Sequence, residues 1–550
     1  MSAKTLIVTV TALLLATTTL TIAQSVTAAD STEDSGIDAT RFNQFQSFVK
    51  SKAPENLDAA GVQIFVDGVT DYIYGYSLLA IAMTERVATT VSGLTPPSAP
   101  TRAPINQLVI GTTLPNPTYH DVVLPSTTTL YASSFMDLTS EPLILHVPAL
   151  PPVVGTNQAR FFIVELLDAW TNVSRQSPSS RQHSQPGDYL LIGPAGTTAS
   201  TAGFIGVIKF DSNTVWSILR FFTDGSEADI QALNDALQNP TDGLTLRPLS
   251  SGTDYKPPSN LPVNPSINTF TQPIKQVNNM DACAFFETMS TMMMTNPPRK
   301  IDALVEPSLK NLGLLTPKKP FSCVDLADQN QVIILQAAVL AAKELLASIN
   351  PPSASTKTNY WSLPLNVGDY GINYILRALV AEKALGANRP QDAVYGYGAY
   401  DSHGIDPTNK EANRLDGANR YVVHFSAETS FHRTGEIPPV HPLGFWSVTL
   451  YDANGFLVDN VNMAPSASYN AIGIPYVQNH KACLNGDGSL DLYIQSDPPS
   501  DPKQFCNWLE TPLPDGSNAT TSKFILFLRA YWPDQAVLNG TWNPPPIVKQ

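Results

Sequence analysis

Charged residues are scarce in this sequence. They make up 15% of the 550 residues, and Asp and Glu outnumber Lys and Arg by 47 to 33, which gives a formal net charge of -14. Because contacts to phosphate groups need a basic surface, this balance excludes nucleic acid as an expected partner. Apolar residues reach 43%, which is enough to fill buried cores and too much for a disordered chain. A chain of this length predicts two or three domains.

Motifs for catalysis and for cofactors are also missing. The sequence has no G-x-S-x-G elbow, no C-x-x-C pair and no H-x-x-x-H pair. The glycine-rich stretch 396–400 has no following Lys and no strand-to-helix context, so it does not indicate a phosphate-binding loop. The cofactor is therefore unknown from the sequence, and nucleotide use is not expected.

One group of residues is a candidate metal site. His424, His432 and His441 lie close together in the chain with Glu436, and imidazole and carboxylate groups suit zinc and related metals. None of their spacings forms a local metal motif. Surface histidines, or histidines satisfied by hydrogen bonds, are the favoured interpretation, and we predict no metal.

The N-terminus has the pattern of an export signal. Lys4 provides the positive charge, the run 6–22 is apolar with several threonines, and small residues follow, with cleavage expected after Ala23 or Ala28. The threonines make the run marginal as a membrane anchor, and no later apolar run has the length of a spanning helix. The sequence therefore predicts a secreted protein that loses residues 1–28 and has no membrane association afterwards.

The four cysteines are an even number, as expected for disulfides in an oxidising compartment, where three pairings are possible. The favoured pair is Cys483 with Cys506, because both flank one predicted hairpin of the C-terminal region. Cys283 with Cys323 is its complement.

Three N-x-[ST] sequons begin at Asn172, Asn518 and Asn539. In a eukaryotic secretory pathway they predict glycosylated surface loops, and Asn518 has the most loop-like surroundings.

Helical and extended segments occur in blocks along the chain. Apolar periodicity and strong helix formers predict helices at 42–48, 72–87, 281–295, 331–349 and 371–387. Short apolar runs between Gly, Pro and Asp turns predict strands at 142–147, 160–167, 189–192, 421–425, 445–451, 490–494 and 523–528.

These blocks predict an α+β fold in three parts. A β-rich N-terminal α+β domain with helical elements spans 29–254, a linker and mainly helical connector spans 255–400, and a C-terminal β sandwich spans 401–550. The linker is expected at 255–268, where Pro, Asn and Ser are frequent.

A series of short stretches in a fixed order resembles a known family. The stretches are DYIYGYSLLAIAMTERV (71–87), DVVLPSTTTLYASSFMDL (121–138), RFFIVELLDAWTNV (160–173), GDYLLIGP (187–194), NRYVVHF (419–425), GFWSVTLYD (444–452), DGSLDLYIQ (487–495), NWLETP (507–512) and FLRAYWP (527–533). Together they resemble proteins that pair domain of unknown function 1254 with domain of unknown function 1214. The resemblance implies a mixed α and β N-terminal domain followed by a jelly-roll-like β sandwich, and it implies no established activity.

Two positions depart from the pattern of that family. The resemblance implies an Asn and an Asp just before Thr129, Leu130 and Tyr131, where this chain has Ser126 and Thr128. A hydroxyl carries no negative charge at neutral pH, so Thr128 cannot replace a carboxylate as a base or as a metal ligand. Both residues are predicted to line the binding site.

Polar residues within apolar runs of the N-terminal domain are the weak catalytic candidates. Asp168 lies beside Trp170, with Glu165 shortly before them, and paired carboxylates near an aromatic ring can do acid–base work. The favoured alternative is that Asp168 caps a turn and Trp170 fills the core. Tyr131 and Arg220 complete the set, with Trp170 as a binding residue and Asp168 as the suggested ion-pair partner of Arg220.

The C-terminal strands add one arginine and several aromatic residues. Arg529, which ends an apolar run, is also predicted to form an internal ion pair. Trp446 and Tyr531 are predicted to lie in the core, whereas Trp532 and Trp542, near turns, are predicted to be more exposed.

Two functions fit this pattern. In the first, the protein is a hydrolase or lyase acting on a small extracellular substrate in a pocket between the domains, lined by Tyr131, Asp168 and Arg220. In the second, it is a non-catalytic secreted binding or structural protein that has lost the polar site of the family. The sequence leaves the choice, the ligand and the oligomeric state open.

Overall fold

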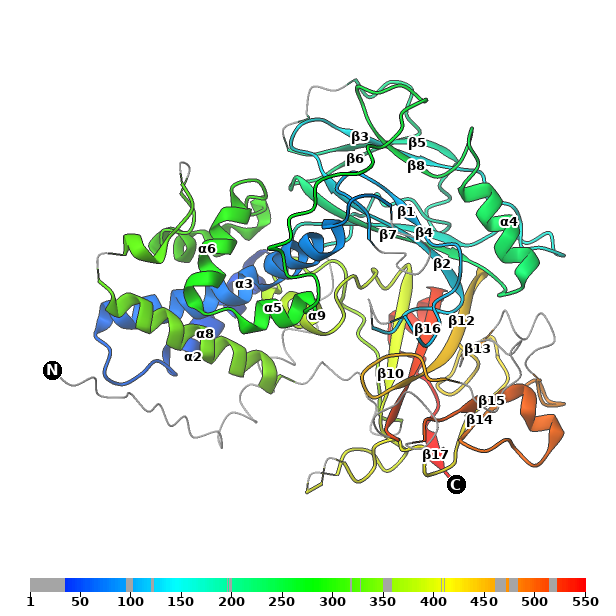
Figure 1. Ribbon diagram of the computed structural model, residues 1–550. Coiled ribbons are helices and arrows are strands. Elements are labelled where there is room, and N and C mark those ends of the chain that lie inside the picture. The colour runs from blue at the N-terminus through cyan, green and yellow to red at the C-terminus, as the bar shows by residue number, and fades with distance from the viewer. Residues whose placement is uncertain are drawn as a thin grey trace.

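The computed structural model describes residues 35–94, 102–119, 123–194, 196, 200–316, 319–326, 328–349, 359–406, 408–409, 411–459, 471–473, 483–513 and 522–550. In these ranges the strands form four sheets, none closed into a barrel, and most helices gather in one body (Figure 1). This helical body lies to the left in Figure 1, with the N-terminal sheets at the upper right and the C-terminal sheets at the lower right. The predicted mixed α and β fold is confirmed, and the predicted signal peptide, 1–28, lies outside the described residues.

The helical body is built around α3 (Ala59–Thr89). Asp58 caps this helix by accepting a hydrogen bond from the Gly61 N–H at 2.8 Å. Apolar residues of α3 occur all around the helix and not in one stripe, because the helix is buried on most of its circumference. At Gly75 a Cβ atom would lie 2.4 Å from the Met289 sulfur, so glycine allows the close approach of α6. The neighbouring helices are α2 (Ser35–Lys50), α5 (Pro273–Asn279), α6 (Ala282–Met293), α7 (Glu306–Asn311), α8 (Asn330–Ser348) and α9 (Tyr374–Lys383), with 3₁₀ turns η1 (Lys300–Leu304) and η2 (Cys323–Asp325).

The spatial units differ from the predicted linear division. One core joins residues of α2 and α3 to residues of α5 to α9, so helices from the predicted N-terminal domain and from the predicted connector form a single body. The predicted linker 255–268 contains no helix or strand. A sequence pattern gives the type of each segment, but it does not show which distant helices share a core.

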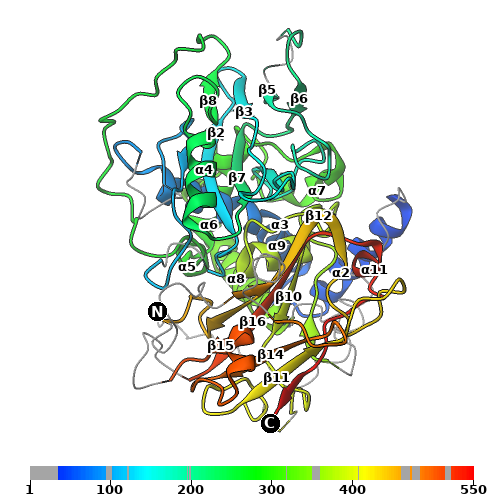
Figure 2. The ribbon, with the colours of Figure 1, turned by 90° about the vertical axis from the view of Figure 1, so that its right-hand side faces the viewer.

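The N-terminal sheets pack on each other around a separate core, with α4 (Glu227–Leu237) against one end. Figure 2 shows them above the C-terminal sheets. Their strand orders are β1–β2–β7–β4 and β6–β5–β3–β8. The strands are β1 (Val109–Ile110), β2 (Thr129–Asp137), β3 (Leu143–Val147), β4 (Phe162–Asp168), β5 (Gly187–Ile192), β6 (Gly206–Lys209), β7 (Thr214–Phe222) and β8 (Thr245–Pro248).

The C-terminal sheets also share one core, with orders β13–β12–β16–β10–β9 and β15–β14–β11–β17. The strands are β9 (Trp361–Ser362), β10 (Ala393–Gly398), β11 (Tyr421–Phe425), β12 (Val440–Asp452), β13 (Ala471–Gly473), β14 (Leu490–Gln495), β15 (Trp508–Glu510), β16 (Phe524–Pro533) and β17 (Ile547–Lys549), with the short helices η3 (Pro502–Asn507) and α11 (Gln535–Leu538). Strands β9 and β10 belong to this unit although they precede the predicted boundary at 401. The jelly-roll-like description stays a prediction.

Both predicted disulfides are present. Cys283 is bonded to Cys323 and Cys483 to Cys506, with Cα–Cα distances of 5.7 Å and 5.9 Å. The pairing is confirmed, but the predicted hairpin between Cys483 and Cys506 is wrong, because β14 is the one strand in 483–506, a range that the structure describes completely.

Helix α8 has the length and composition of a membrane-spanning helix, contrary to the expectation that no later run would, and it is the one such helix in the described ranges. It packs against α3, and Leu335, Ala338, Val339 and Ala342 are buried in the helical core. Core helices of soluble proteins commonly have this composition as well.

Asp71 lies inside the helical body without an ion-pair partner among the described residues. Its side chain is fully buried, and burial raises its pKa well above the usual value. The Ser308 hydroxyl lies 2.5 Å from Asp71 Oδ1 and 2.9 Å from the Val305 carbonyl oxygen. One hydroxyl hydrogen cannot serve two acceptors fully. A protonated Asp71 Oδ1 that donates to Ser308, which in turn donates to Val305, gives each of these three oxygens a partner. Asp71 Oδ2 is buried without a partner among the described residues, which an uncharged carboxyl group tolerates better than a carboxylate.

We expect Asp71→Asn to stabilise the protein at alkaline pH. A carboxyl group with a raised pKa in the folded state contributes stability below its unfolded pKa, and this contribution is lost as the pH rises through the folded pKa. Melting temperatures should therefore match the native protein near about pH 4 and exceed it near about pH 8. Asp235→Asn, on the exposed side of α4, should show no such difference. Equal destabilisation of Asp71→Asn at both pH values would contradict the neutral form.

Candidate functional site

The N-terminal sheet β1–β2–β7–β4 has one apolar and one partly polar face. Leu219 and Phe221 of β7 belong to the N-terminal core, so Arg220 between them points to the opposite face. The strand register places Tyr131 of β2 directly beside Arg220, and Glu165 of β4 lies on the same face. Alternation along three strands thus gathers a cation, a carboxyl group and a phenol.

The C-terminal sheet that contains β16 also has one apolar face and one partly polar face. Leu528 and Ala530 lie in the C-terminal core, which turns Arg529 and Tyr531 to the other face. Tyr395 of β10 is the register partner of Arg529 on that face.

The two partly polar faces meet. The rings of Phe222 and Phe445 have centroids 4.4 Å apart, and the Phe161 ring lies 5.8 Å from Tyr531, within one small apolar core. In Figure 1, β2, β4 and β7 lie above β10, β12 and β16 at this junction. We call the polar residues enclosed there the interdomain cluster, which consists of Tyr131, Glu165, Arg220, Tyr395, Tyr451, Arg529 and Tyr531.

Glu165 is the carboxyl group of the interdomain cluster. It is fully buried and forms an ion pair with Arg220, whose long contacts include Asn388 Oδ1 at 3.4 Å. Burial raises the pKa of Glu165 to about 7, although the charge of Arg220 opposes this rise. Glu165 Oε1 is buried and has no hydrogen-bond partner among the described residues. The predicted internal ion pair of Arg220 is confirmed, but its suggested partner, Asp168, is wrong.

Arg529 is buried without a carboxylate. It donates hydrogen bonds to the Leu124 carbonyl oxygen at 2.6 Å, to the Tyr451 hydroxyl at 2.8 Å and to Thr449 Oγ1 at 3.2 Å. Its guanidinium group also lies 4.6 Å from the Phe527 ring centroid. Among the described residues no carboxylate lies within ion-pair distance, so the predicted ion pair of Arg529 is wrong.

The tyrosines of the cluster surround both arginines. Tyr131, Tyr395 and Tyr531 lie within electrostatic range of Arg220 and also of Arg529. Burial raises the pKa of Tyr395 and Tyr531, and it raises that of Tyr451 to about 12, so these hydroxyls are neutral donors at physiological pH. Tyr131 and Tyr395 remain partly exposed, which shows that the cluster is not completely sealed.

Ser126 and Thr128 lie at the edge of the interdomain cluster and are buried. Their hydroxyl oxygens are 3.0 Å apart, and the Ser126 N–H donates to the Tyr131 hydroxyl at 2.9 Å. The Tyr451 hydroxyl donates to the carbonyl oxygen of Pro125 at 2.6 Å. These contacts place Ser126 and Thr128, both predicted to line the binding site, where the two sheets meet.

Buried polar atoms without partners occur around this junction. They include Thr129 Oγ1 and Ser447 Oγ in addition to Glu165 Oε1, and Ser447 is the register partner of Arg529. Buried polar atoms are normally paired, so each such group needs an explanation. The sequence analysis missed Tyr395, Ser447 and Tyr451. Their signal was present, since polar residues alternate with apolar ones along β10 and β12.

Asp168 and Trp170 belong to other surroundings. Asp168 Oδ1 accepts hydrogen bonds from the N–H groups of Trp170 and Asn172, both at 2.8 Å, and thus caps a turn. Trp170 lies in the helical core, where its indole N–H donates to the Pro297 carbonyl oxygen at 3.2 Å. The interpretation as a turn cap and a core residue is the correct one, and the catalytic pair is not supported.

The candidate metal ligands lie apart. His424 pairs with Asp491, and Glu436 accepts hydrogen bonds from Thr429, whereas His441 stacks on Trp532 at 3.6 Å. The described ranges contain no group of three or more residues arranged to hold a metal ion.

The aromatic predictions for the C-terminal part are mostly correct. Trp446 and Tyr531 are buried as predicted, and Trp532 is partly exposed. Trp542 is fully buried, contrary to expectation. Its indole N–H is satisfied there by a hydrogen bond of 3.0 Å to the Glu436 carbonyl oxygen.

The sequons differ in accessibility. Asn172 is buried, and its amide nitrogen donates to both carboxylate oxygens of Asp168, so a glycan there would break the turn. Asn172 is therefore withdrawn as an expected glycosylation site. Asn539 is exposed and stays a prediction, and Asn518 lies outside the described residues.

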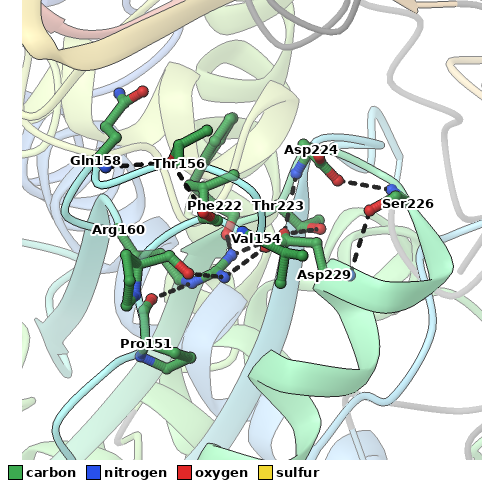
Figure 3. A network of polar contacts seen from close by, with 12 residues as sticks. Pro151, Val154, Thr156, Gln158, Arg160, Phe222, Thr223, Asp224, Ser226 and Asp229 are labelled. Atoms are coloured by element: carbon green, nitrogen blue, oxygen red, sulfur yellow. Dashed lines mark hydrogen bonds and ion pairs between the residues drawn. The ribbon is translucent and has the colours of Figure 1, made fainter.

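A second buried ion pair provides a structural contrast. Arg160 binds Asp229 through two hydrogen bonds of 2.6 and 2.9 Å and also donates to the carbonyl oxygens of Pro151, Pro152 and Phe222 (Figure 3). Burial alone would raise the pKa of Asp229, but the hydrogen bonds from Arg160 and other donors outweigh it and lower the pKa. This network joins the start of α4 to the end of β7 and leaves no carboxylate oxygen unpaired, unlike the Glu165 pair.

The fold and the site define a protein of two sheet-containing parts with a polar cluster between them. The models of two families, each described as "Protein of unknown function" (DUF1254 and DUF1214), match residues 105–247 and 404–535. The chain belongs to the family of proteins that pair these two domains. Each matched region contributes residues to the interdomain cluster, whereas nearly all of the helical body lies outside both.

Two solved structures are similar to this chain. The VPA0106 protein from Vibrio parahaemolyticus has a TM-score of 0.58 and 18% identity, over 88% of this chain and 100% of that one. This likeness supports the fold alone. An uncharacterised protein from Burkholderia cenocepacia aligns with a TM-score of 0.37 and 12% identity, over 94% and 96% of the two chains, and supports no argument. No curated protein matches the chain.

We expect Asp229→Asn to destabilise the N-terminal sheets. Removing one partner of a buried ion pair leaves an uncompensated charge and costs about 3–5 kcal/mol. Asp369→Asn breaks the exposed pair with Arg175 and should cost about 1 kcal/mol or less. Urea unfolding of both variants measures the difference, and equal midpoints would contradict the structural role of the Arg160 network.

Proposed function

We propose that the protein binds a small polar molecule between the two sheets and acts on it by proton transfer, as a hydrolase or lyase. The observation that carries the proposal is Glu165, whose Oε1 atom is buried without a partner. A carboxyl group with a pKa near 7 is present in both protonation states at neutral pH, which is the condition for efficient acid–base catalysis.

The neighbours of Glu165 suit this role. Arg220 holds the carboxyl group through one oxygen, which leaves Oε1 for a proton of the ligand. The Tyr131 hydroxyl accepts the Ser126 N–H, and it donates no hydrogen bond within the described ranges. Tyr131 is thus arranged to donate to a ligand oxygen while Glu165 accepts or returns a proton.

A non-catalytic binding protein is the alternative. It is favoured by Ser126 and Thr128, two hydroxyls where the resemblance to the family implies an amide and a carboxylate. The same cluster would then hold a ligand without changing it. Binding would persist in this case, and no turnover would depend on Glu165.

We also propose that the protein is exported and loses its first residues. The two disulfides are consistent with an oxidising compartment. The apolar N-terminal run with small residues at Ala23 and Ala28 supports cleavage at one of these sites.

We expect Glu165→Gln to lower kcat by about 10²–10⁴-fold on a substrate found by screening small esters, lactones and hydroxy acids. The rate of the native protein should change with a pKa near 7, and this dependence should disappear in the variant. Glu85→Gln is the matched control, because burial also raises the pKa of Glu85 to about 7, on α3 and outside the cluster. Unchanged turnover in Glu165→Gln would refute the catalytic role, whereas ligand binding without any turnover would favour the alternative.

Mass spectrometry of the protein purified from a eukaryotic secretory host tests the export proposal. We expect the mature chain to begin after position 23 or 28 and a glycan to be attached at Asn539 but not at Asn172. An intact N-terminus on secreted protein would contradict cleavage, and an occupied Asn172 would contradict the buried turn.

A further inference from the structure

We infer that the ligand of the interdomain cluster carries a carboxylate group, which Arg529 anchors; this inference rests on the proposed function. Its basis is the combination of an unneutralised buried cation, unpaired polar atoms and partly exposed aromatic rings on the same sheet face.

The charge of Arg529 distinguishes it from the other buried arginines. Arg160, Arg220 and Arg299 each form an ion pair with a carboxylate. Arg377 has none in the described ranges, but Asp168 and Asp302 lie within its electrostatic range. The strongest electrostatic neighbours of Arg529 are tyrosines alone. A buried guanidinium without a counter-charge is costly, and an anionic ligand removes that cost.

Arg529 also keeps hydrogen-bonding capacity. A guanidinium group has five N–H hydrogens, and the three hydrogen bonds to Leu124, Thr449 and Tyr451 use three of them. Two N–H groups are therefore left without an acceptor among the described residues. Ser447, directly across the strand pair, supplies a buried hydroxyl without a partner. Carboxylate oxygens accept hydrogen bonds from both kinds of donor.

The aromatic surroundings indicate the rest of the ligand. The rings of Tyr395 and Phe527 stack with centroids 5.7 Å apart beside Arg529, and both are partly exposed. Such rings favour a flat or apolar body next to the carboxylate. The ligand class is thus a small carboxylic acid with an aromatic or alkyl group, and not a free inorganic anion.

Calorimetric titration of the full chain with benzoate and with benzamide tests the inference, because the two probes share a shape and differ in charge. We expect benzoate to bind native protein at least tenfold more tightly than benzamide. Arg529→Gln should remove this preference, whereas Arg175→Gln, at an exposed arginine, should keep it. Arg529→Lys keeps the charge and should therefore retain part of the preference for benzoate. It is the variant to measure if Arg529→Gln does not fold.

Three outcomes would overturn the inference. Equal binding of the two probes to native protein, or a preference for benzoate that survives in Arg529→Gln, would exclude Arg529 as the anchor. Failure of benzoate to bind at millimolar concentration would exclude the ligand class. The proposed function is judged separately with Tyr131→Phe. If benzamide binds as tightly as benzoate and Tyr131→Phe weakens the binding of both, the proposed binding site is supported and only the carboxylate preference is refuted. If neither Tyr131→Phe nor Arg529→Gln changes the affinity for benzoate, the interdomain cluster is not the binding site.

Discussion

The contact between the sheet that contains β7 and the sheet that contains β16 is the constraint on which the rest of the site depends. Each sheet uses its alternate residues to complete its own core, and the remaining residues must face the other sheet. Phe222 and Phe445 close one side of this contact with apolar surface. The arginines and tyrosines on the same two faces lie within electrostatic range of groups from the other part.

This arrangement explains the unusual electrostatics of the cluster. Arg220 and Arg529 are both buried, and the tyrosines near them come from both parts, since Tyr131 belongs to β2 and Tyr531 to β16. Glu165 neutralises one arginine, and tyrosine hydroxyls solvate the other. The Arg160–Asp229 pair, by contrast, is completed within the N-terminal sheets and satisfies all its acceptors. The Glu165–Arg220 pair, in contrast, leaves Glu165 Oε1 without a partner among the described residues.

Local properties of the chain were predictable from the sequence, whereas the partners of the site residues were not. Apolar periodicity identified α6, α8 and most of the long strands, and an even cysteine count in the right regions led to both disulfides. Tyr131 and Arg220 were correctly brought together, because each stands out in an apolar run. Asp168 was wrongly grouped with Tyr131 and Arg220. The carboxyl group on their face of the sheet belongs to Glu165, three residues earlier. Alternation puts positions 165 and 168 on opposite faces of β4, but only the pairing with β7, which joins distant segments, shows which of these faces carries Arg220.

The segment before β2 is held to the C-terminal sheet through main-chain atoms. Arg529 and Tyr451 donate to the carbonyl oxygens of Leu124 and Pro125, and a carbonyl oxygen is the same in every amino acid. These two hydrogen bonds do not depend on which side chains residues 124 and 125 carry. A different side chain at position 126 or 128 would therefore change the polar groups at the junction while both main-chain attachments remain available.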